Sequence, residues 1–188
     1  MRFRDLFMQN LIHGTSVDYQ SGNIVAFYLN GSYKGLMVLN ERLNEDFLYS
    51  NYGLDEEDID MVSINSNGYQ LENGSMDVFN ELLEELNNDP TSEDYYERIN
   101  RLMDLNEYTE YMIFEQFIGN TDWPANNTKI WRHKNNGRFS WLVYDTDFGF
   151  GLYEGWGPNY TNVNLDMIDF CMGKGEASNW GNANTKTY

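Results

Sequence analysis

The segment Asn120–Gly151 constrains the fold of this chain more than any other, because it has the pattern of a β-hairpin with polar residues at its open end. The pattern predicts an outgoing strand over Thr128–Lys134 and a return strand over Arg138–Tyr144. Asn135-Asn136-Gly137 stands between them, and Asn-Gly favours a turn because Gly accepts a positive φ without steric cost. Two strands of equal length would bring the residues that flank the hairpin back together.

The residues that flank this hairpin carry oxygen atoms. Asp122 and Asn127 precede it, and Asp145 and Asp147 follow it. We expect Asn127 to face Asp145 across the open end, since paired strands lie roughly 4.8 Å apart. Asp147 would share that face, because residues i and i+2 of an extended segment point to the same side. Mg²⁺ prefers such oxygen ligands, so the pattern predicts a divalent-cation site made by Asn127, Asp145 and Asp147.

The order of these parts resembles the catalytic segment of protein kinases. In those enzymes an Asp accepts the proton of the substrate hydroxyl, an Asn further along the loop binds Mg²⁺, and the Asp of Asp-Phe-Gly binds Mg²⁺ after a hairpin. Here Asp122 and Asn127 have the kinase spacing, and Asp147-Phe148-Gly149 supplies the motif. Asn120-Thr121 stands where those kinases have His-Arg. The resemblance implies that Asp122 is the catalytic base.

The composition limits the partners of the chain. Its 188 residues suit one domain, or most of one. Lys and Arg total 12 against 30 Asp and Glu, which gives a net charge of −18. That charge argues against nucleic acid and against an anionic membrane surface, because binding to phosphates needs a basic surface. A strongly negative charge fits a basic protein substrate. The alternative is that the charge serves only to keep the protein in solution.

The sequence also argues against several further kinds of protein. Its one cysteine, Cys171, forms no disulfide framework and, with two His, no Cys/His metal cluster, so we interpret it as an incidental thiol. No apolar run is long enough to span a membrane. We expect no signal peptide, because Met1-Arg2-Phe3-Arg4-Asp5 leads directly into an amphipathic pattern. His13 and His133 have no partners at the spacing of a nucleophilic triad.

Hydrophobic periodicity predicts an α+β fold. Expected helices cover Phe3–Ile12, Glu45–Tyr52, Met76–Leu86, a stretch capped by Thr91 or Ser92 that runs to about Met103, and Leu105–Ile118. Expected strands before the main hairpin are Ile24–Leu29 and Tyr33–Leu39, on either side of Asn30-Gly31, and Met61–Ile64. We expect residues 152–188 to be irregular, with Tyr160–Asn164 outside regular structure and Ala177–Tyr188 frayed. The layout is protein-kinase-like, with an antiparallel small-lobe hairpin followed by a mainly helical lobe that carries the catalytic β-hairpin.

Several runs of residues together resemble the spore-coat protein H (CotH) kinase family. The most specific are Gly119–Asn127 and Trp141–Gly151, with Trp131-Arg132 between them. The matching runs upstream are Arg4-Asp5-Leu6, Asp18-Tyr19-Gln20, Tyr28–Gly35 and Asn40-Glu41-Arg42. The resemblance covers about Phe3–Gly151. It implies an atypical protein kinase that transfers the γ-phosphoryl group of ATP to Ser or Thr hydroxyls, with spore-coat proteins as the best-known substrates of the family.

The resemblance also implies a division of the chain. Residues 1–151 would be a partial kinase domain, with 1–43 as the end of the small lobe and 44–151 as the helical lobe. Residues 152–188 would be an incomplete C-terminal part. We expect the phosphate-binding Lys or Arg to lie outside this chain, because Lys34 lies beside a turn and no Gly-rich phosphate loop precedes it. The polypeptide is therefore expected to be a fragment that lacks N-terminal strands of the small lobe and, alone, binds ATP poorly.

Roles for individual residues follow from the resemblance, and each has a structural alternative. Asp122 would be catalytic, whereas its alternative is a cap on the loop before Pro124. Asn127 would contact ATP and the metal, and Asp145 or Asp147 would bind Mg²⁺ or Mn²⁺, with Asp145 ranked first; turn formation is the alternative for all three. Glu41 would lie near an adenine pocket, although a solvated charge is the more ordinary interpretation.

The tryptophans and the function of the whole chain also allow more than one interpretation. We interpret Trp123, Trp131 and Trp141 as core residues rather than recognition residues, with Trp131 opposite Trp141 in the expected register.

Instead of a kinase, the same scaffold could serve as a non-catalytic coat or cell-surface binding protein, or as a Ca²⁺-binding module. Spore coat, cell envelope and cytoplasm all stay open as locations.

Overall fold

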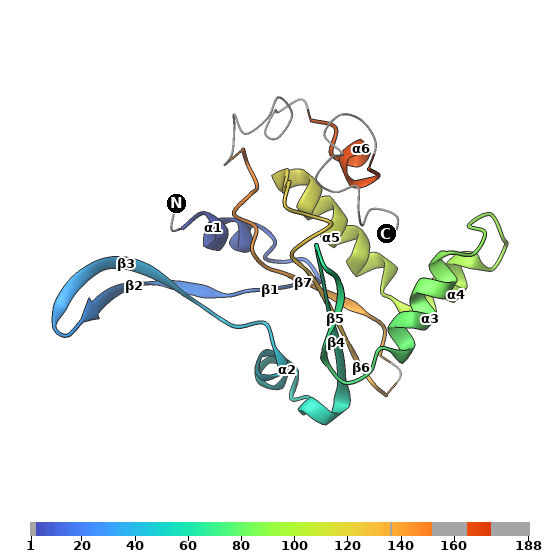
Figure 1. Ribbon diagram of the computed structural model, residues 1–188, viewed down its shortest axis with the longest axis horizontal. Helices are drawn as coiled ribbons and strands as arrows, with labels where there is room; N and C mark the ends of the chain where they lie inside the picture. Colours follow the sequence, from blue (N-terminus) through green and yellow to red (C-terminus); the bar gives the residue numbers. More distant parts are fainter. Residues whose placement is uncertain (1–2, 136, 152–164, 174–188) are drawn as a thin grey trace.

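The structure is a computed structural model that describes residues 3–135, 137–151 and 165–173. It has the mixed α+β content that the sequence predicts (Figure 1). Its helices are α1 (Arg4–Leu11), α2 (Glu45–Tyr52), α3 (Asp77–Leu86), α4 (Tyr95–Leu102), α5 (Leu105–Ile118) and α6 (Met167–Cys171), with the 3₁₀ helix η1 (Glu56–Asp58). Its strands are β1 (Asp18–Tyr19), β2 (Gly22–Leu29), β3 (Ser32–Asn40), β4 (Ile59–Asn65), β5 (Gly68–Asn73), β6 (Thr128–His133) and β7 (Ser140–Val143). The expectations for Tyr160–Asn164 and Ala177–Tyr188 fall outside the described residues.

A five-stranded sheet in the order β1-β7-β6-β4-β5 forms the centre of the body. Neighbouring strands in this sheet are antiparallel, except that β1 pairs with β7 in parallel. Strand β4 is buried from Ile59 to Ile64, which explains its apolar sequence and confirms the shorter strand predicted over Met61–Ile64. The region after residue 44 contains the helices α2 to α6 and also strands β4, β5, β6 and β7 of this sheet.

Helices cover both faces of the sheet. On one face, Ile130 and Trp141 pack with apolar side chains of α3, α4 and α5. On the opposite face, Met61 and Trp131 pack against α2 through Phe47. Successive residues of a strand point to opposite sides, so each strand contributes to both clusters. Among the described residues, no helix combines the length and the apolar character that a membrane crossing requires.

The pairing of β6 with β7 differs from the expected register by one residue. Ile130 lies opposite Trp141, and Trp131 lies opposite Ser140. The expected pairing of Trp131 with Trp141 is therefore wrong, and the two rings lie on different faces of the sheet. Trp123, Trp131 and Trp141 are nevertheless all buried, as the interpretation of these residues as core requires.

The connection between β6 and β7 explains the shift. Strand β6 ends at His133 and β7 begins only at Ser140, so the connection is longer than the three-residue turn expected. Inside it, the N–H of Gly137 donates to the carbonyl of His133 at 2.9 Å. Phe139 is fully buried and forms a bridge with Met103. Phe139 is thus packed in the core directly before the return strand begins.

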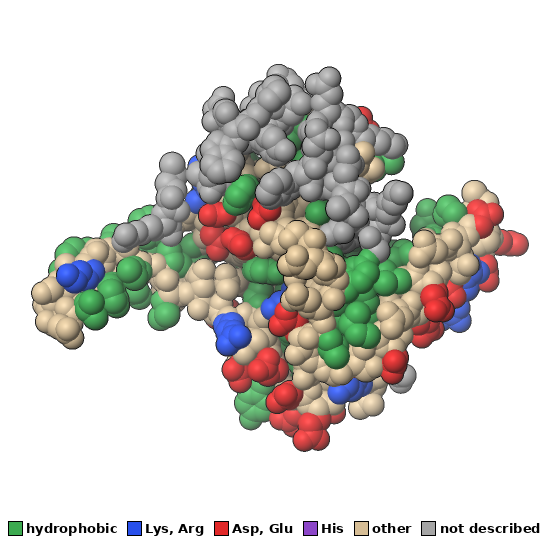
Figure 2. Space-filling model, in the orientation of Figure 1, with side chains coloured by type: hydrophobic (Ala, Val, Ile, Leu, Met, Phe, Trp, Pro, Cys, Tyr) green, Lys and Arg blue, Asp and Glu red, His purple; other side chains and the backbone are tan. Residues whose placement is uncertain are grey.

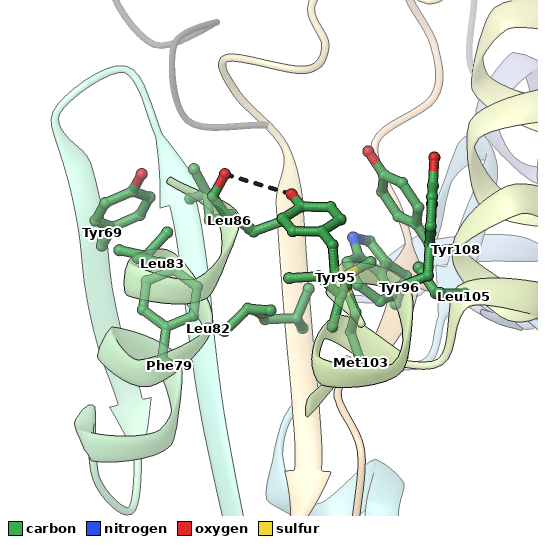
Figure 3. Close-up of a pocket in the computed structure, with 14 residues that line it drawn as sticks. Tyr69, Phe79, Leu82, Leu83, Leu86, Tyr95, Tyr96, Met103, Leu105 and Tyr108 are labelled. Carbon is green, nitrogen blue, oxygen red and sulfur yellow. Dashed lines mark hydrogen bonds between the residues drawn. The ribbon is translucent and has the colours of Figure 1, made fainter. Parts of the chain in front are cut away.

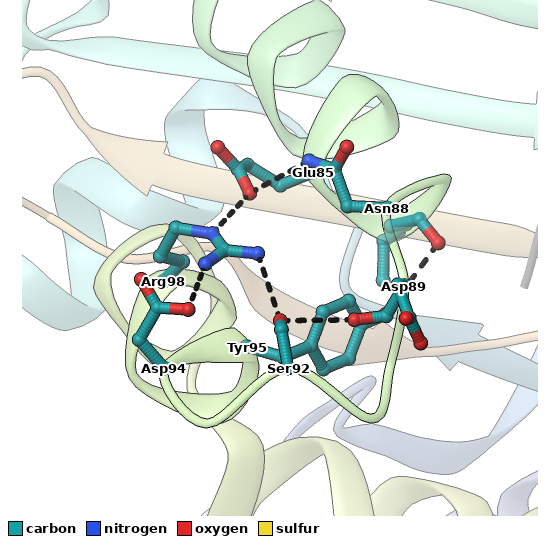
Figure 4. Close-up of polar contacts among 8 residues, drawn as sticks. Glu85, Asn88, Asp89, Ser92, Asp94, Tyr95 and Arg98 are labelled. Atoms are coloured by element: carbon teal, nitrogen blue, oxygen red, sulfur yellow. Dashed lines mark hydrogen bonds and ion pairs between the residues drawn. The ribbon is translucent and has the colours of Figure 1, made fainter.

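Helices α3 and α4 form a hairpin whose two helices are linked by Arg98 (Figure 4). The guanidinium of Arg98 pairs with Glu85 of α3 at 2.8 Å and with Asp94, which lies one helical turn earlier. It also donates to the hydroxyl of Ser92 at 3.4 Å. Pairs of this kind near the surface contribute little stability singly, so the apolar contacts beneath the helices hold them on the sheet.

Strands β2 and β3 form a separate two-stranded sheet, which extends away from the body as an arm (Figure 1). The predicted turn is confirmed, since Asn30 and Gly31 have φ values of 50° and 79°, the positive values that a two-residue hairpin turn needs. Hydrophobic side chains lie along the arm (Figure 2). The exposed large ones are Ile24, Phe27, Tyr28, Leu29, Tyr33, Leu36, Met37 and Leu39.

Candidate active site

The loop after α5 places Asp122 beside Asn127. Helix α5 ends at Gly119, whose φ of 62° allows the chain to leave the helix. The amide nitrogen of Asn127 donates to Asp122 Oδ2 at 2.8 Å, and that of Asn126 donates to the same oxygen at 3.2 Å. The side chain of Asp122 is thus fixed by two amides. Because Asn127 uses its nitrogen here, its amide oxygen is the atom suited to a cation.

The open end of the β6–β7 hairpin has a different geometry from the one expected. Lys129 lies opposite Leu142, and continuation of this register places Asn127 opposite Tyr144 rather than Asp145. Asn127 and Asp145 also have φ values of 54° and 53°, a left-handed conformation that few residues except Gly adopt and that Asn and Asp tolerate best. The expectation that Asn127 faces Asp145 directly is therefore wrong, because both residues turn out of the strands.

Four carboxylates nevertheless influence one another at this end of the hairpin, and we call Asp5, Asp122, Asp145 and Asp147 the acidic cluster. Loss of hydration raises the pKa of Asp145 to about 6, and the negative charges of Asp147, Asp5 and Asp122 add to that rise. Loss of hydration also raises the pKa of Asp147, again with contributions from Asp5 and Asp122. Arg4 offsets part of the effect on Asp147. The acidic cluster is a region of concentrated negative charge.

Helix α1 holds the segment that carries Asp145 and Asp147. Asp5 Oδ1 accepts hydrogen bonds from the backbone N–H and the hydroxyl of Thr146, both at 2.8 Å. Thr146, between the two acids, is fully buried. Arg4 donates to the carbonyl of Gly149 at 2.8 Å. Sequence reasoning gave Asp5 no role, although Arg4-Asp5-Leu6 is one of the runs that resemble the family.

Glu41 lies at the base of the arm, directly after strand β3. Its side chain is exposed, and its carboxylate accepts from the N–H of Ser21 at 3.0 Å. The backbone carbonyl of Glu41 accepts from the side chain of Gln20. These contacts give Glu41 a part in joining the arm to the body. The structure joins Asp122 to Asn127 by a hydrogen bond, and the charges of Asp122 and Asp147 act on Asp145.

The donor atoms of this site have the chemistry that a divalent cation requires. Carboxylate and amide oxygens suit Mg²⁺, and a cation would offset the loss of hydration and the repulsion that together raise the pKa of Asp145. Within the described residues, however, no group of three His, Cys, Asp or Glu side chains is gathered closely enough to form a metal site. Asp145, Asp147 and the amide oxygen of Asn127 are the atoms that fit a cation, and they would have to draw closer to bind it.

An apolar cavity of about 190 Å³ lies elsewhere, between the α3–α4 hairpin and the sheet (Figure 3). Its lining is aliphatic and aromatic. The residues labelled in the figure are Tyr69, Phe79, Leu82, Leu83, Leu86, Tyr95, Tyr96, Met103, Leu105 and Tyr108. None of its lining residues is acidic or basic. Since phosphoryl groups and metal ions need charged or polar partners, this cavity does not suit nucleotide phosphates.

The protein is therefore an α+β protein with an acidic site at the open end of a hairpin. Sequence comparison then gives its family: the family described as CotH kinase protein matches residues 1–186. The chain belongs to the CotH kinase family, and the match continues beyond Gly151, the last residue of the matching motifs. No curated protein matches the chain. Membership points to a kinase, a class that uses ATP and a divalent metal in general.

Proposed function

We propose that this protein transfers the γ-phosphoryl group of ATP to Ser or Thr hydroxyls of a basic protein. The observation that carries the proposal is the 2.8 Å hydrogen bond between Asn127 and Asp122, beside the mutually repelling Asp145 and Asp147. It joins the two residues whose spacing matches the catalytic loop of kinases. The net charge of −18 favours a basic substrate. Spore-coat or surface proteins are the substrates that the family suggests.

In this proposal Asp122 orients the acceptor hydroxyl and takes its proton. Asn126 and Asn127 both donate to Oδ2 of Asp122, which fixes the carboxylate before the substrate arrives. A positioned general base contributes about 10²- to 10⁴-fold to rate. Asp122 is 9% exposed, so little water competes with the substrate for its carboxylate.

Asp145, Asp147 and the amide oxygen of Asn127 would hold Mg²⁺ or Mn²⁺. When bound, the cation would neutralise charge on the β- and γ-phosphates. Asp5 contributes indirectly, because its two hydrogen bonds to Thr146 hold the residue between both acids. Most of the rate gain would come from positioning and from charge stabilisation.

The test is label transfer from [γ-³²P]ATP to a Ser-rich basic protein, with Mg²⁺, Mn²⁺ or Ca²⁺ in separate reactions. Asp122→Asn removes the proton acceptor at nearly constant shape and should lower transfer by about 10²-fold or more. Asp77→Asn, an exposed acid in the first turn of α3, is the charge-matched control and should transfer normally. Transfer that survives Asp122→Asn contradicts the catalytic role, and transfer in excess EDTA contradicts the metal roles.

A binding role is the second candidate function, and the arm favours it. Leu39 is 65% exposed and Tyr28 is 60% exposed, which is unusual for large apolar side chains on a two-stranded sheet. A non-catalytic coat or surface protein would use this arm to hold a partner. Capture of a coat or surface protein by a chain that transfers no label would support binding over catalysis.

A further inference from the structure

Glu115 is a buried carboxyl group outside the acidic cluster. It lies on α5 and is only 1% exposed. Its Oε2 accepts a hydrogen bond from the side-chain nitrogen of Asn120 at 2.9 Å, and Asn120 is itself fully buried. A carboxyl group in the protein interior is costly unless it is hydrogen-bonded. The hydrogen bond from Asn120 meets this requirement, and the other contacts of Asn120 indicate what the pair does.

Asn120 links Glu115 to the catalytic loop. Its side-chain oxygen accepts from the backbone N–H of Asp122 at 3.2 Å. The backbone N–H of Asn120 donates to the backbone carbonyl of Glu115 at 3.1 Å. One asparagine thus uses both ends of its amide and its backbone to join the end of α5 to Asp122.

We propose that Glu115 is a positioning residue for Asp122 and acts through Asn120. The inference rests on the proposed function of Asp122. It also gives a role to a departure from the kinase pattern, since Asn120-Thr121 replaces the His-Arg of protein kinases. In this chain a buried Glu–Asn pair fixes the backbone at Asp122.

The protonation of Glu115 suggests how to separate its roles. Burial raises the pKa of Glu115 to about 8, against the opposing hydrogen bond from Asn120. The group is thus largely neutral at pH 7, and a glutamine can replace it without loss of charge. Gln keeps an oxygen that can accept from Asn120, whereas Leu has similar bulk and no acceptor.

The kinetic test compares Glu115→Leu with Glu115→Gln in the full chain. Glu115→Leu should lower kcat for label transfer about 10- to 100-fold, because a small displacement of a catalytic group has effects of this size, while KM for ATP changes less than about twofold. Glu115→Gln should restore most of kcat. Asn120→Ala breaks the same link from the loop side and should match Glu115→Leu.

Glu107→Leu is the matched control. Glu107 is also a buried acid on α5, and it accepts from the N–H of Trp141 at 2.7 Å. Its loss should lower stability but leave kcat unchanged. If Glu115→Leu keeps full kcat, or if Glu115→Gln is as impaired as Glu115→Leu, the positioning role is wrong.

A second measurement is independent of catalysis. Hydrogen exchange followed by NMR should show the amide of Asp122 protected in the wild-type chain and in Glu115→Gln. The same amide should exchange at least about tenfold faster in Glu115→Leu and Asn120→Ala, with the amide of Trp141 unchanged. Equal protection in all four proteins overturns the inference. A wild-type chain that transfers no label contradicts the proposed function instead, and the exchange result still decides the role of Glu115.

Discussion

The two ends of the β6–β7 hairpin are built on opposite principles. At the closed end, the buried guanidinium of Arg132 donates to Asp60 at 2.6 Å and to the carbonyls of Gly137 and Lys134, both at 3.0 Å. Opposite charges meet there, and the hydrogen-bonding groups are satisfied. The contacts of Arg132 therefore stabilise the closed end of the hairpin.

At the open end, charges of the same sign meet. Loss of hydration, with the negative charges of the rest of the acidic cluster, raises the pKa of Asp145 to about 6, and both Asn127 and Asp145 hold left-handed backbone conformations. Repulsion and backbone strain of this kind persist only where the surrounding structure imposes them, and they concentrate at functional sites. One hairpin is therefore stabilised by an ion pair at one end and carries repelling carboxylates at the opposite end.

The largest expected effect is on stability at the closed end. Asp60→Asn removes the charge partner of buried Arg132, and we expect it to lower the free energy of unfolding by about 3–5 kcal/mol. Asp122→Asn is the matched change at the open end and should cost less than about 1 kcal/mol. Urea denaturation followed by tryptophan fluorescence measures both. Equal losses would contradict the contrast between the two ends.

The next effect is stabilisation by a divalent cation at the open end. Mg²⁺ at ten times its dissociation constant should raise the free energy of unfolding by about 1.4 kcal/mol, because it binds only the folded chain. Asp145→Asn should abolish most of this gain. Asp60→Asn, although less stable overall, should keep it. A gain of the same size in Asp145→Asn and in the wild-type chain would remove Asp145 from the metal site.

Local elements of the fold could be predicted from the sequence. Helices Glu45–Tyr52 and Leu105–Ile118 have the bounds that periodicity gave, and Asn30-Gly31 forms its turn because the conformation it needs is encoded in those two residues. Strand β5 escaped prediction, since Gly68–Asn73 is a largely exposed edge strand with a polar sequence. The register of β6 with β7 also escaped, because it depends on how Phe139 and Arg132 are buried by distant parts of the chain.

In the candidate site, too, the local features could be predicted from the sequence and the long-range contacts could not. The spacing of Asp122 and Asn127 is local, and the structure joins the two side chains by a hydrogen bond. The support from Asp5 is not local, because Thr146 lies 141 positions away in the sequence. Only the packing of α1 beside the segment after β7 reveals it. The residues proposed to act directly share a recognisable spacing, whereas Asp5 lies in a run that matches the family but gives no indication of its contact with Thr146.

A smaller effect concerns backbone strain at the open end. Asn127 has a φ of 54°, a conformation that costs residues with a Cβ roughly 1–2 kcal/mol and costs Gly almost nothing. Asn127→Gly and Asn127→Ala both lose the hydrogen bond to Asp122, so the difference between them isolates the strain. We expect Asn127→Gly to be more stable by about 1 kcal/mol in urea denaturation. Variants of equal stability would show that the left-handed conformation is not kept in solution.

The smallest effect is a pH dependence that only the open end should show. The pKa of Asp145 is about 6 in the folded chain, above its ordinary value of 3.8, so the folded state holds more protons than the unfolded state between about pH 4 and pH 6. Stability contributed by this group therefore falls as pH rises through that window. Asp145→Asn should be more stable than the wild-type chain at pH 7 by about 0.5 kcal/mol, since a partly exposed group is strongly screened, and no more stable at about pH 4. Because Glu107 and Glu115 also have raised pKa values, the informative quantity is the difference between variant and wild type at each pH. A difference that stays constant across this range would mean that the pKa of Asp145 is not raised in the folded chain, and the contrast with the closed end would then rest on Arg132 alone.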